Sequence, residues 1–145
     1  MGGLGWEGSR LGPWLLAAII ASACAGPPLE LHASLENETI DRGGALRGEV
    51  VLQNLTDAEV EVSAPGLPEI ALTVYRDGER VGGNTPYLLN EVWQRTLPPD
   101  GSFTHMEGPL FRSVDLPPGD YELLVELWTH QYGVLSAGRL EFAVR

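Results

Sequence analysis

The sequence predicts an all-β protein, an antiparallel Greek-key β-sandwich of about seven to eight strands over residues 29–145. Three observations predict this fold. Apolar and polar residues alternate with the period of a half-buried strand, turn-forming residues separate these runs, and no segment keeps a helical period over a dozen residues. With 43% hydrophobic and 20% charged residues, a chain of 145 residues can build one domain with one core.

The first predicted strand shows the alternation most clearly. Leu29, Leu31, Ala33 and Leu35 fall on one face, and the polar residues between them fall on the other. Residues 88–95 are the only stretch compatible with a turn or two of helix. Further strands are expected at residues 49–55, 60–62, 70–75, 121–127 and 140–144.

Turn-forming residues mark where these strands end. Asp77-Gly78 is the strongest hairpin signal, because both central residues of a type I′ turn need positive φ. The Pro-Pro pairs in residues 98–101 and 117–120 indicate rigid turns where no ladder N–H is required. Two earlier turns are expected at residues 41–44 and 54–57.

A turn, a tyrosine and an alternating strand follow one another in residues 116–125, Leu-Pro-Pro-Gly-Asp-Tyr-Glu-Leu-Leu-Val. This run resembles the penultimate strand of bacterial immunoglobulin-like sandwiches, in which the tyrosine hydroxyl bonds back to the turn. The resemblance implies an immunoglobulin-like fold. It also implies that the ring of Tyr121 is buried and that its hydroxyl bonds to nearby backbone.

A second resemblance rests on residues 48–62, Gly-Glu-Val-Val-Leu-Gln-Asn-Leu-Thr-Asp-Ala-Glu-Val-Glu-Val. This strand, Asn-x-Thr-Asp turn and strand resemble the beginning of the BsuPI-type intracellular proteinase inhibitor domain. The similarity continues through residues 72–78, 97–102 and 116–121. It implies the same sandwich fold and, as one possible activity, inhibition of a protease through a presented loop.

The amino terminus is typical of an export signal. Residues 11–23 form an uncharged apolar run of the length of a signal-peptide core, too short for a membrane-spanning helix of about 20 residues. We therefore assign residues 1–23 to a signal peptide and residues 24–28 to a short tether. The expected location is outside the cytoplasm, at the cell membrane or envelope.

Ala21-Ser22-Ala23-Cys24 can be interpreted in two ways, and both make Cys24 the first residue of the mature chain. As an A-x-A site it suits ordinary signal peptidase. It also resembles the lipobox of bacterial lipoproteins, with Ala21 where that signal usually has Leu. Cys24 is the only cysteine of the chain and stands where acylation requires one. We predict lipidation of Cys24, with simple secretion as the alternative.

Charge and composition exclude several functions. The net charge of −11 would repel nucleic acid over most of the surface, so no nucleic-acid partner is expected. All nine basic residues are arginines, which excludes Schiff-base chemistry and a P-loop lysine. With a single cysteine, no intramolecular disulfide can form.

The sequence contains no recognisable catalytic or metal-binding pattern. His32, His105 and His130 lie on separate predicted strands, without partners at metal-ligand spacing. Asp100, Ser102 and His105 lie close in sequence, but no Gly-x-Ser-x-Gly elbow surrounds the serine. We therefore predict a protein that is not an enzyme and has no metal or cofactor.

Residues 82–97 form the longest stretch without a clear strand period, and a connection of this length is uncommon unless it has a function. This segment is the predicted binding site because it is rich in the residue types of interface hot spots. The alternative is that Leu88, Leu89 and Trp93 close one open end of the sandwich. The predicted binding residues are Tyr87, Leu88, Leu89, Trp93 and Arg95.

Together these features predict an exported, lipid-anchored, non-catalytic protein-binding module of the bacterial cell envelope. One alternative is a proteinase inhibitor of the BsuPI type, in which case the protein partner is a protease. The other alternative is a structural accessory subunit of an envelope complex. The identity of the partner is not encoded in any recognisable motif.

Overall fold

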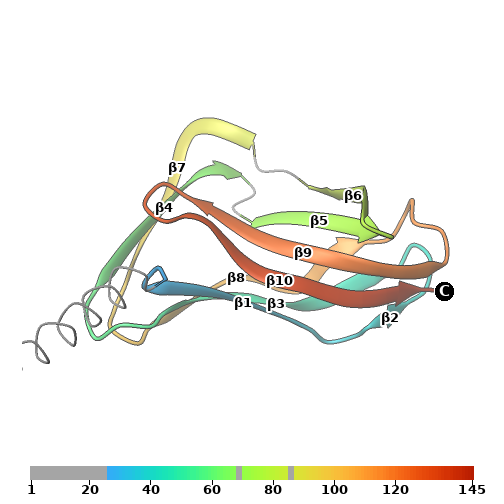
Figure 1. Ribbon diagram of the computed structural model, residues 1–145, viewed down its shortest axis with the longest axis horizontal. Helices are drawn as coiled ribbons and strands as arrows, with labels where there is room; N and C mark the ends of the chain where they lie inside the picture. Colours follow the sequence, from blue (N-terminus) through green and yellow to red (C-terminus); the bar gives the residue numbers. More distant parts are fainter. Residues whose placement is uncertain (1–25, 68–69, 85–86) are drawn as a thin grey trace, which may run out of the picture.

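The protein is described here by a computed structural model that covers residues 26–67, 70–84 and 87–145, with the side chains of residues 66, 67 and 87–92 left out. These ranges contain ten strands and no helix (Figure 1). Within them, no helix has the length and hydrophobicity needed to cross a bilayer. The strands are β1 (Leu29–Leu35), β2 (Thr39–Ile40), β3 (Ala45–Asn54), β4 (Val60–Leu67), β5 (Ile70–Arg76), β6 (Glu79–Asn84), β7 (Tyr87–Leu97), β8 (Ser102–Arg112), β9 (Gly119–Thr129) and β10 (Gly133–Val144).

The strands form a sandwich of two sheets with a two-stranded arm. One sheet has the order β1-β3-β8, the other has the order β2-β10-β9-β5-β6, and β4 pairs with β7. Every pairing is antiparallel except the short one between β2 and β10. This is the strand order of an immunoglobulin-like Greek-key sandwich, so the predicted fold is confirmed. The described strand count of ten exceeds the predicted seven to eight, and β2, β6, β7 and β8 lie outside the predicted strand ranges.

The first strand of the sandwich is shared between the two sheets. β1 pairs with β3, and after a short break β2 pairs with β10 in the opposite sheet. Asn37 lies in this break, where its side-chain amide donates to Ala45 O (3.3 Å) and its Oδ1 accepts from Arg47 N (2.8 Å). The Asn37 side chain therefore takes the place of backbone hydrogen bonds that the break between β1 and β2 interrupts. It connects the chain at this break to β3.

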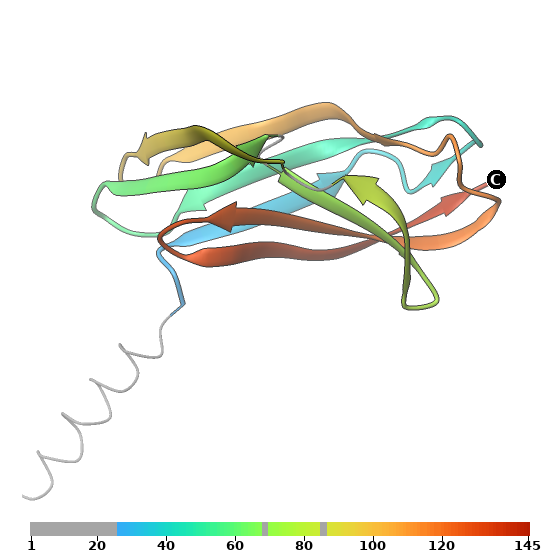
Figure 2. The same cartoon turned by 90° about the horizontal axis from the view of Figure 1, so that it is seen from above.

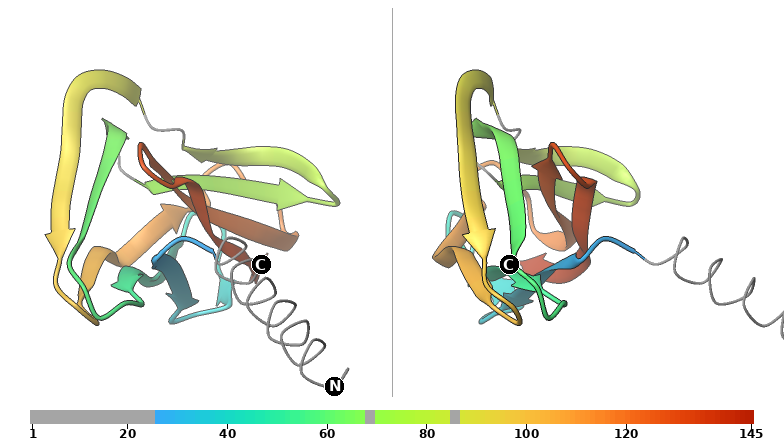
Figure 3. Two further views of the ribbon diagram at one scale, coloured as in Figure 1. Left: turned by 60° about the vertical axis from the view of Figure 1, so that its left-hand side comes forward. Right: turned by 90° about the vertical axis from the view of Figure 1, so that its left-hand side faces the viewer.

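Strands β4 to β7 form a long interrupted hairpin folded back at Asp77-Gly78. Asp77 (φ 51°) and Gly78 (φ 81°) both have positive φ, which confirms the predicted type I′ turn. The β5–β6 part belongs to the five-stranded sheet, whereas β4 and β7 pair only with each other (Figure 3). The expected loop over residues 82–97 and helical turn over residues 88–95 are wrong, because β6 and β7 occupy most of this segment.

A bulge explains why the sequence pattern did not predict β7 as a strand. β4 advances two residues from Ala64 to Gly66, while β7 covers five from Trp93 to Leu88. The exposed Arg95 also lies between Trp93 and the buried Leu97 on one face of the strand, which breaks the alternation of apolar and polar residues. The chain is extended here without the period that identifies a strand.

β8 was also missed, and for the same physical reason. Two bulges opposite β3 shift its register, one between Val50 and Val51 and the other between Leu46 and Arg47. The residues of β8 that oppose the inward positions of β3 are therefore spaced three, two and three apart. They are Phe103, Met106, Gly108 and Phe111.

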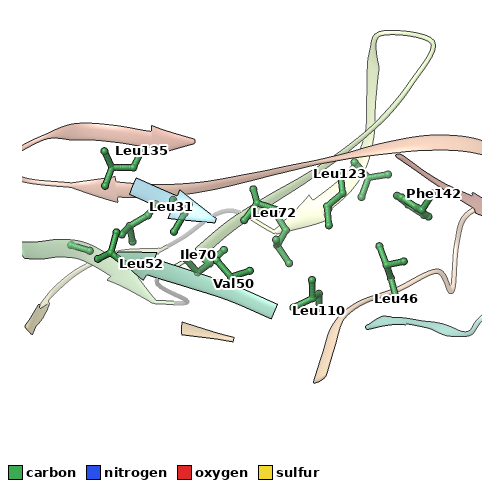
Figure 4. Close-up of a cluster of buried hydrophobic side chains, with 14 of the residues drawn as sticks. Leu31, Leu46, Val50, Leu52, Ile70, Leu72, Leu110, Leu123, Leu135 and Phe142 are labelled. Atoms are coloured by element: carbon green, nitrogen blue, oxygen red, sulfur yellow. The ribbon is translucent and has the colours of Figure 1, made fainter. Parts of the chain in front are cut away.

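The core fills the space between the two sheets (Figure 4). β9 contributes every second side chain from Tyr121 to Leu127, and β3 contributes Leu46, Val50 and Leu52. A fully buried side chain of this kind contributes about 1.5–3 kcal/mol of transfer free energy. The largest fully buried apolar side chains are Leu46, Leu52, Ile70, Leu72, Leu123 and Leu127.

The predicted tyrosine corner is present at the start of β9. Tyr121 is 3% exposed, and its hydroxyl donates to Pro117 O in the preceding turn. Its ring stacks on Phe142 with centroids 5.5 Å apart, and Arg76 donates to the hydroxyl oxygen at 3.3 Å. The corner thus connects the turn before β9 to the core and to β5.

The fully buried Asn54 joins two turns at the amino-terminal end of the sandwich. Its side-chain amide donates to Ala58 O (2.8 Å) and Pro98 O (2.9 Å), and its Oδ1 accepts from Thr56 N (2.9 Å). A buried amide satisfied in this way is costly to remove. Asn54 therefore holds the turn that connects β7 to β8 against the turn that follows β3.

The two ends of the sandwich carry different loops (Figure 2). The described chain begins at Gly26 beside the turn at Leu55, where Leu55 N donates to Pro28 O (2.8 Å). The carboxyl terminus lies at the opposite end, where Arg145 O accepts from Arg42 N (3.1 Å). Buried Ser113 organises that end by bonding to backbone oxygens of residues 41 and 44.

Candidate functional site

All five predicted binding residues lie on β7, but only two have described side chains. The backbones of Tyr87 and Leu88 pair with Leu67 and Gly66 at the far end of the arm. The side chains of Tyr87, Leu88 and Leu89, like all of Cys24, lie outside the described residues. Trp93 and Arg95 are described, and the site is built from them.

β7 and β8 leave the turn at residues 98–101 in different directions (Figure 3). β8 is the last strand in the order β1-β3-β8, and β7 pairs only with β4. Within the described residues, each of these two strands therefore has one edge without a ladder partner. An unpaired edge presents backbone N–H and C=O groups that another strand can bind.

Four side chains lie where β7 and β8 separate, and we call Trp93, Arg95, Phe103 and His105 the seam cluster. The ring of Trp93 lies 5.5 Å from that of Phe103 and 4.8 Å from that of His105, centroid to centroid. The Arg95 guanidinium lies over both neighbouring rings, 5.0 Å from Phe103 and 5.7 Å from Trp93. These separations are typical of aromatic and cation–π contacts.

Trp93 and Arg95 differ in burial. Trp93 is half-buried and packs against the core, and its indole Nε1 is buried without a hydrogen-bond partner in the described part of the chain. Arg95 is exposed and, among the described side chains, forms no ion pair with a carboxylate. Trp93 thus packs against the core, whereas the Arg95 guanidinium covers the two rings and donates to Gln94 O (3.2 Å).

Phe103 and His105 belong to the seam cluster, although the sequence did not indicate them as binding residues. Both are partly buried and follow the rigid turn that ends at Gly101, and Phe103 packs against the core. The turn at residues 98–101 was predicted, but no local pattern showed that the residues on either side of it come together where the two strands diverge. The bulge at His105 hid this by breaking the strand period.

Ser63 and His130 form a contact that the sequence did not predict. Ser63 Oγ lies 2.9 Å from His130 Nδ1, and Gln131 Nε2 donates to the same hydroxyl at 3.1 Å. The backbone of Ser63 is also engaged, since its N–H donates to Gln131 Oε1 and its carbonyl accepts from His130 N. Four hydrogen bonds thus join β4 to the turn between β9 and β10. Ser63 and His130 are therefore better explained as a structural contact that holds the two-stranded arm than as a nucleophile and its base.

The other titratable groups are dispersed. His32 lies on β1 beside Glu30 (3.6 Å), so the three histidines occupy three separate places. Among the described residues, no group of three His, Cys, Asp or Glu side chains is arranged to hold a metal ion. Asn37 uses its side-chain amide for the backbone bonds described above.

A hollow of about 490 Å³ lies on the outer face of the five-stranded sheet. Arg139 already interacts there, with its guanidinium 4.4 Å from the centre of the Tyr75 ring and 3.9 Å from Glu122. The concentration of carboxylates makes this hollow unsuited to an anionic ligand. Its acidic lining residues are Glu38, Asp77, Asp120, Glu122 and Glu141.

No family model matches the sequence, and no curated protein matches it. Similarity to solved structures is confined to low sequence identity. Spo0M, a sporulation control protein from Bacillus subtilis, aligns with a TM-score of 0.53 and 14% identity over 82% of this chain and 50% of that one. The present chain therefore spans half the length of Spo0M.

A second similar structure is the CARDB domain of the PF1109 protein from Pyrococcus furiosus, solved in complex with di-metal ions. It aligns with a TM-score of 0.47 and 12% identity over 83% of this chain and 90% of the domain. At these identities a structural likeness speaks to fold and not to activity. The similarity to Spo0M bears on the fold alone, and any function must be argued from the residues of this chain.

Proposed function

We propose that the protein is an exported, lipid-anchored, non-catalytic protein-binding module of the bacterial cell envelope, and that the seam cluster contacts its partner. The observation that carries the proposal is the coincidence of two unpaired strand edges with exposed Arg95 and the partly buried aromatic rings that it covers. Each feature alone is common on protein surfaces. Their combination at one place favours recognition of another polypeptide.

The physical basis is the addition of a partner strand to an open sheet edge. Main-chain hydrogen bonds to β7 or β8 would supply affinity, and side chains of the partner would contact the seam cluster. Trp and Arg are enriched among residues that dominate binding energy. The exposed guanidinium of Arg95, which pairs with no carboxylate among the described side chains, favours a partner that presents a carboxylate or a carbonyl oxygen there.

The membrane anchor is proposed from the sequence. Cys24 follows a signal-like apolar segment and is separated from β1 by only a few residues. The seam cluster lies toward the same end of the sandwich, since Phe103 pairs with Leu52 near the turn at Asn54. A partner in or close to the same membrane would therefore meet the seam cluster readily.

Site-specific photo-crosslinking in intact cells tests the binding proposal. A photoreactive amino acid replaces exposed Gln94 or Thr96 on β7, with exposed Val114 at the other end of the sandwich as the matched control. We expect one protein to be crosslinked from positions 94 and 96 and not from 114. Equal crosslinking from all three positions, or crosslinking from 114 alone, contradicts the proposal.

The identity of the crosslinked protein distinguishes the alternatives. A subtilisin-like protease that the purified protein also inhibits would support a BsuPI-type inhibitor. A stoichiometric envelope complex that loses its integrity without this chain would support an accessory subunit. A partner that binds reversibly, with neither property, would support the module proposed here.

Lipidation is tested separately by mass spectrometry of the mature amino terminus. We expect an acylated Cys24, and we expect Cys24→Ser to release the protein in soluble form, because stable anchoring requires more than one acyl chain. An unmodified thiol on the mature protein would exclude the lipid anchor, but it would not contradict binding of a partner at the seam cluster.

A further inference from the structure

An apolar corner lies at the amino-terminal end of the sandwich. Four large apolar side chains are exposed among the described residues, and two of them, Leu55 (50%) and Val134 (56%), line the same hollow of about 390 Å³. Pro27, just before β1, lines it too. We call Pro27, Leu55 and Val134 the apolar corner.

The corner is held by ordered backbone. Leu55 N donates to Pro28 O (2.8 Å), which ties the turn after β3 to the start of the described chain. Val134 pairs with Trp128 across β9 and β10, and Thr129 Oγ1 donates to Gly133 O (2.8 Å) in the turn between them. Leu55, in its turn, and Val134, at the start of β10, are therefore presented by ordered backbone that cannot easily withdraw them from solvent.

The length of chain before the corner limits how far it can lie from an anchor. Cys24 precedes Gly26 by two residues, and an extended residue spans at most about 3.6 Å, so the two Cα atoms are separated by less than about 8 Å. The apolar run at residues 11–23 ends immediately before Cys24. Any anchor at this position holds the apolar corner next to the lipid.

We propose that the apolar corner docks on the lipid surface and fixes the orientation of the sandwich. This inference rests on the proposed anchor at Cys24. Two exposed apolar side chains bind a bilayer weakly in free solution, but a short tether converts the contact into an intramolecular one with a high effective concentration. The turns at Asp77-Gly78 and around Val114 then face away from the membrane.

The charges around the apolar corner indicate which kind of lipid surface can dock there. Glu30 lines the hollow, and Asp57 and Asp100 are exposed on the two turns joined by Asn54. These carboxylates would be repelled by anionic headgroups. The occupant that fits is therefore a zwitterionic surface, and added anionic lipid should weaken docking.

The test uses the full chain, because its single cysteine allows Cys24 to be coupled to a maleimide lipid in phosphatidylcholine nanodiscs that carry a gadolinium-chelating lipid. Methyl NMR then measures the paramagnetic relaxation of Leu55, Val134 and the control Val114. We expect relaxation at Leu55 and Val134 to exceed that at Val114 by about fivefold or more, as tethering at one end and docking together imply.

Two variants separate docking from mere tethering. Leu55→Asp is expected to lower the relaxation of Val134 about threefold or more, and Val134→Asp to do the same for Leu55, because either charge removes the weak contact that the tether amplifies. Val114→Asp, at a side chain that is 61% exposed, should change neither. Replacing part of the phosphatidylcholine with phosphatidylglycerol should reduce both signals.

Relaxation at Val134 that is unaffected by Leu55→Asp would show a tether without docking and overturn the inference. The inference would also be overturned if the apolar segment before Cys24 occupied the hollow. A change in the chemical shifts of Leu55 and Val134 in the absence of nanodiscs would show this. Because the coupling is chemical, an unmodified Cys24 in cells would contradict the proposed anchor without altering this result.

Discussion

β9 and β7 are both strands of eleven residues, yet they differ in almost every other respect. β9 is paired on both sides, by β5 and β10, and its side chains alternate between buried and half-buried along most of its length. β7 is paired on one side, contains a bulge and carries exposed Arg95 beside half-buried Trp93. Pairing on both sides imposes a strict alternation of inward and outward side chains on β9. A strand paired on one side, such as β7, keeps unpaired backbone groups and a less regular side-chain pattern, and both suit recognition of a partner.

The largest expected effect concerns the start of β9. Tyr121→Ala should lower the free energy of unfolding by about 3–5 kcal/mol, because it removes a buried ring packed on Phe142. Tyr121→Phe should cost about 1 kcal/mol or somewhat more, since it keeps the ring and removes the bonds of the hydroxyl to Pro117 O and Arg76. Urea unfolding measures both values, and equal small losses for the two variants would contradict the tyrosine corner.

The junction below β7 should be nearly as sensitive. Asn54→Ala is expected to cost about 2–4 kcal/mol, because it removes a fully buried side-chain amide that bonds to Ala58 O, Pro98 O and Thr56 N. The control is Asn37→Ala, at a less buried amide that also bonds to backbone, and its loss should be smaller. Equal losses in chemical denaturation would mean that burial of Asn54 does not fix the β7–β8 turn.

Trp93 should show an intermediate effect, because it is only half-buried. Trp93→Ala is expected to cost about 1–2 kcal/mol of stability, less than the roughly 3–5 kcal/mol of a fully buried aromatic. A loss at the upper value would make Trp93 a core residue and weaken its assignment to recognition. Differential scanning calorimetry alongside urea unfolding distinguishes these outcomes.

The hairpin turn between β5 and β6 should be less sensitive. Gly78→Ala is expected to cost about 1 kcal/mol, because Gly78 has a φ of 81° that a side chain disfavours although the space around it is open. Gly82→Ala in the same hairpin, where φ is not positive and the nearest atom is 3.9 Å away, should cost less. A larger loss of stability for Gly82→Ala than for Gly78→Ala in thermal unfolding would contradict the type I′ turn.

The regular part of the fold was predictable from sequence, and the irregular part was not. β1 agrees with its predicted bounds, and the turns at Asp77-Gly78 and before Tyr121 were found because each depends on local residue chemistry. β7 and β8 were missed because bulges remove the two-residue period that identifies a strand.

The candidate site was predicted only in part, and for a related reason. Trp93 and Arg95 were identified by residue type, whereas Phe103 and His105 join them through a divergence of two strands that no local pattern encodes. The tie between Ser63 and His130, which are 67 residues apart, likewise depends on topology. Long-range juxtaposition of this kind becomes visible only when the strand order is known.

The affinity of the Arg95→Ala protein for the crosslinked partner, compared with that of Arg112→Ala, tests the central claim most directly. Both arginines are exposed, and Arg112 lies at the opposite end of β8, so each substitution should change stability by no more than about 0.5 kcal/mol. We expect Arg95→Ala to weaken binding by about tenfold or more and Arg112→Ala to leave the Kd unchanged. Unchanged binding by a stably folded Arg95→Ala protein, or equal loss in both variants, would contradict recognition at the seam cluster.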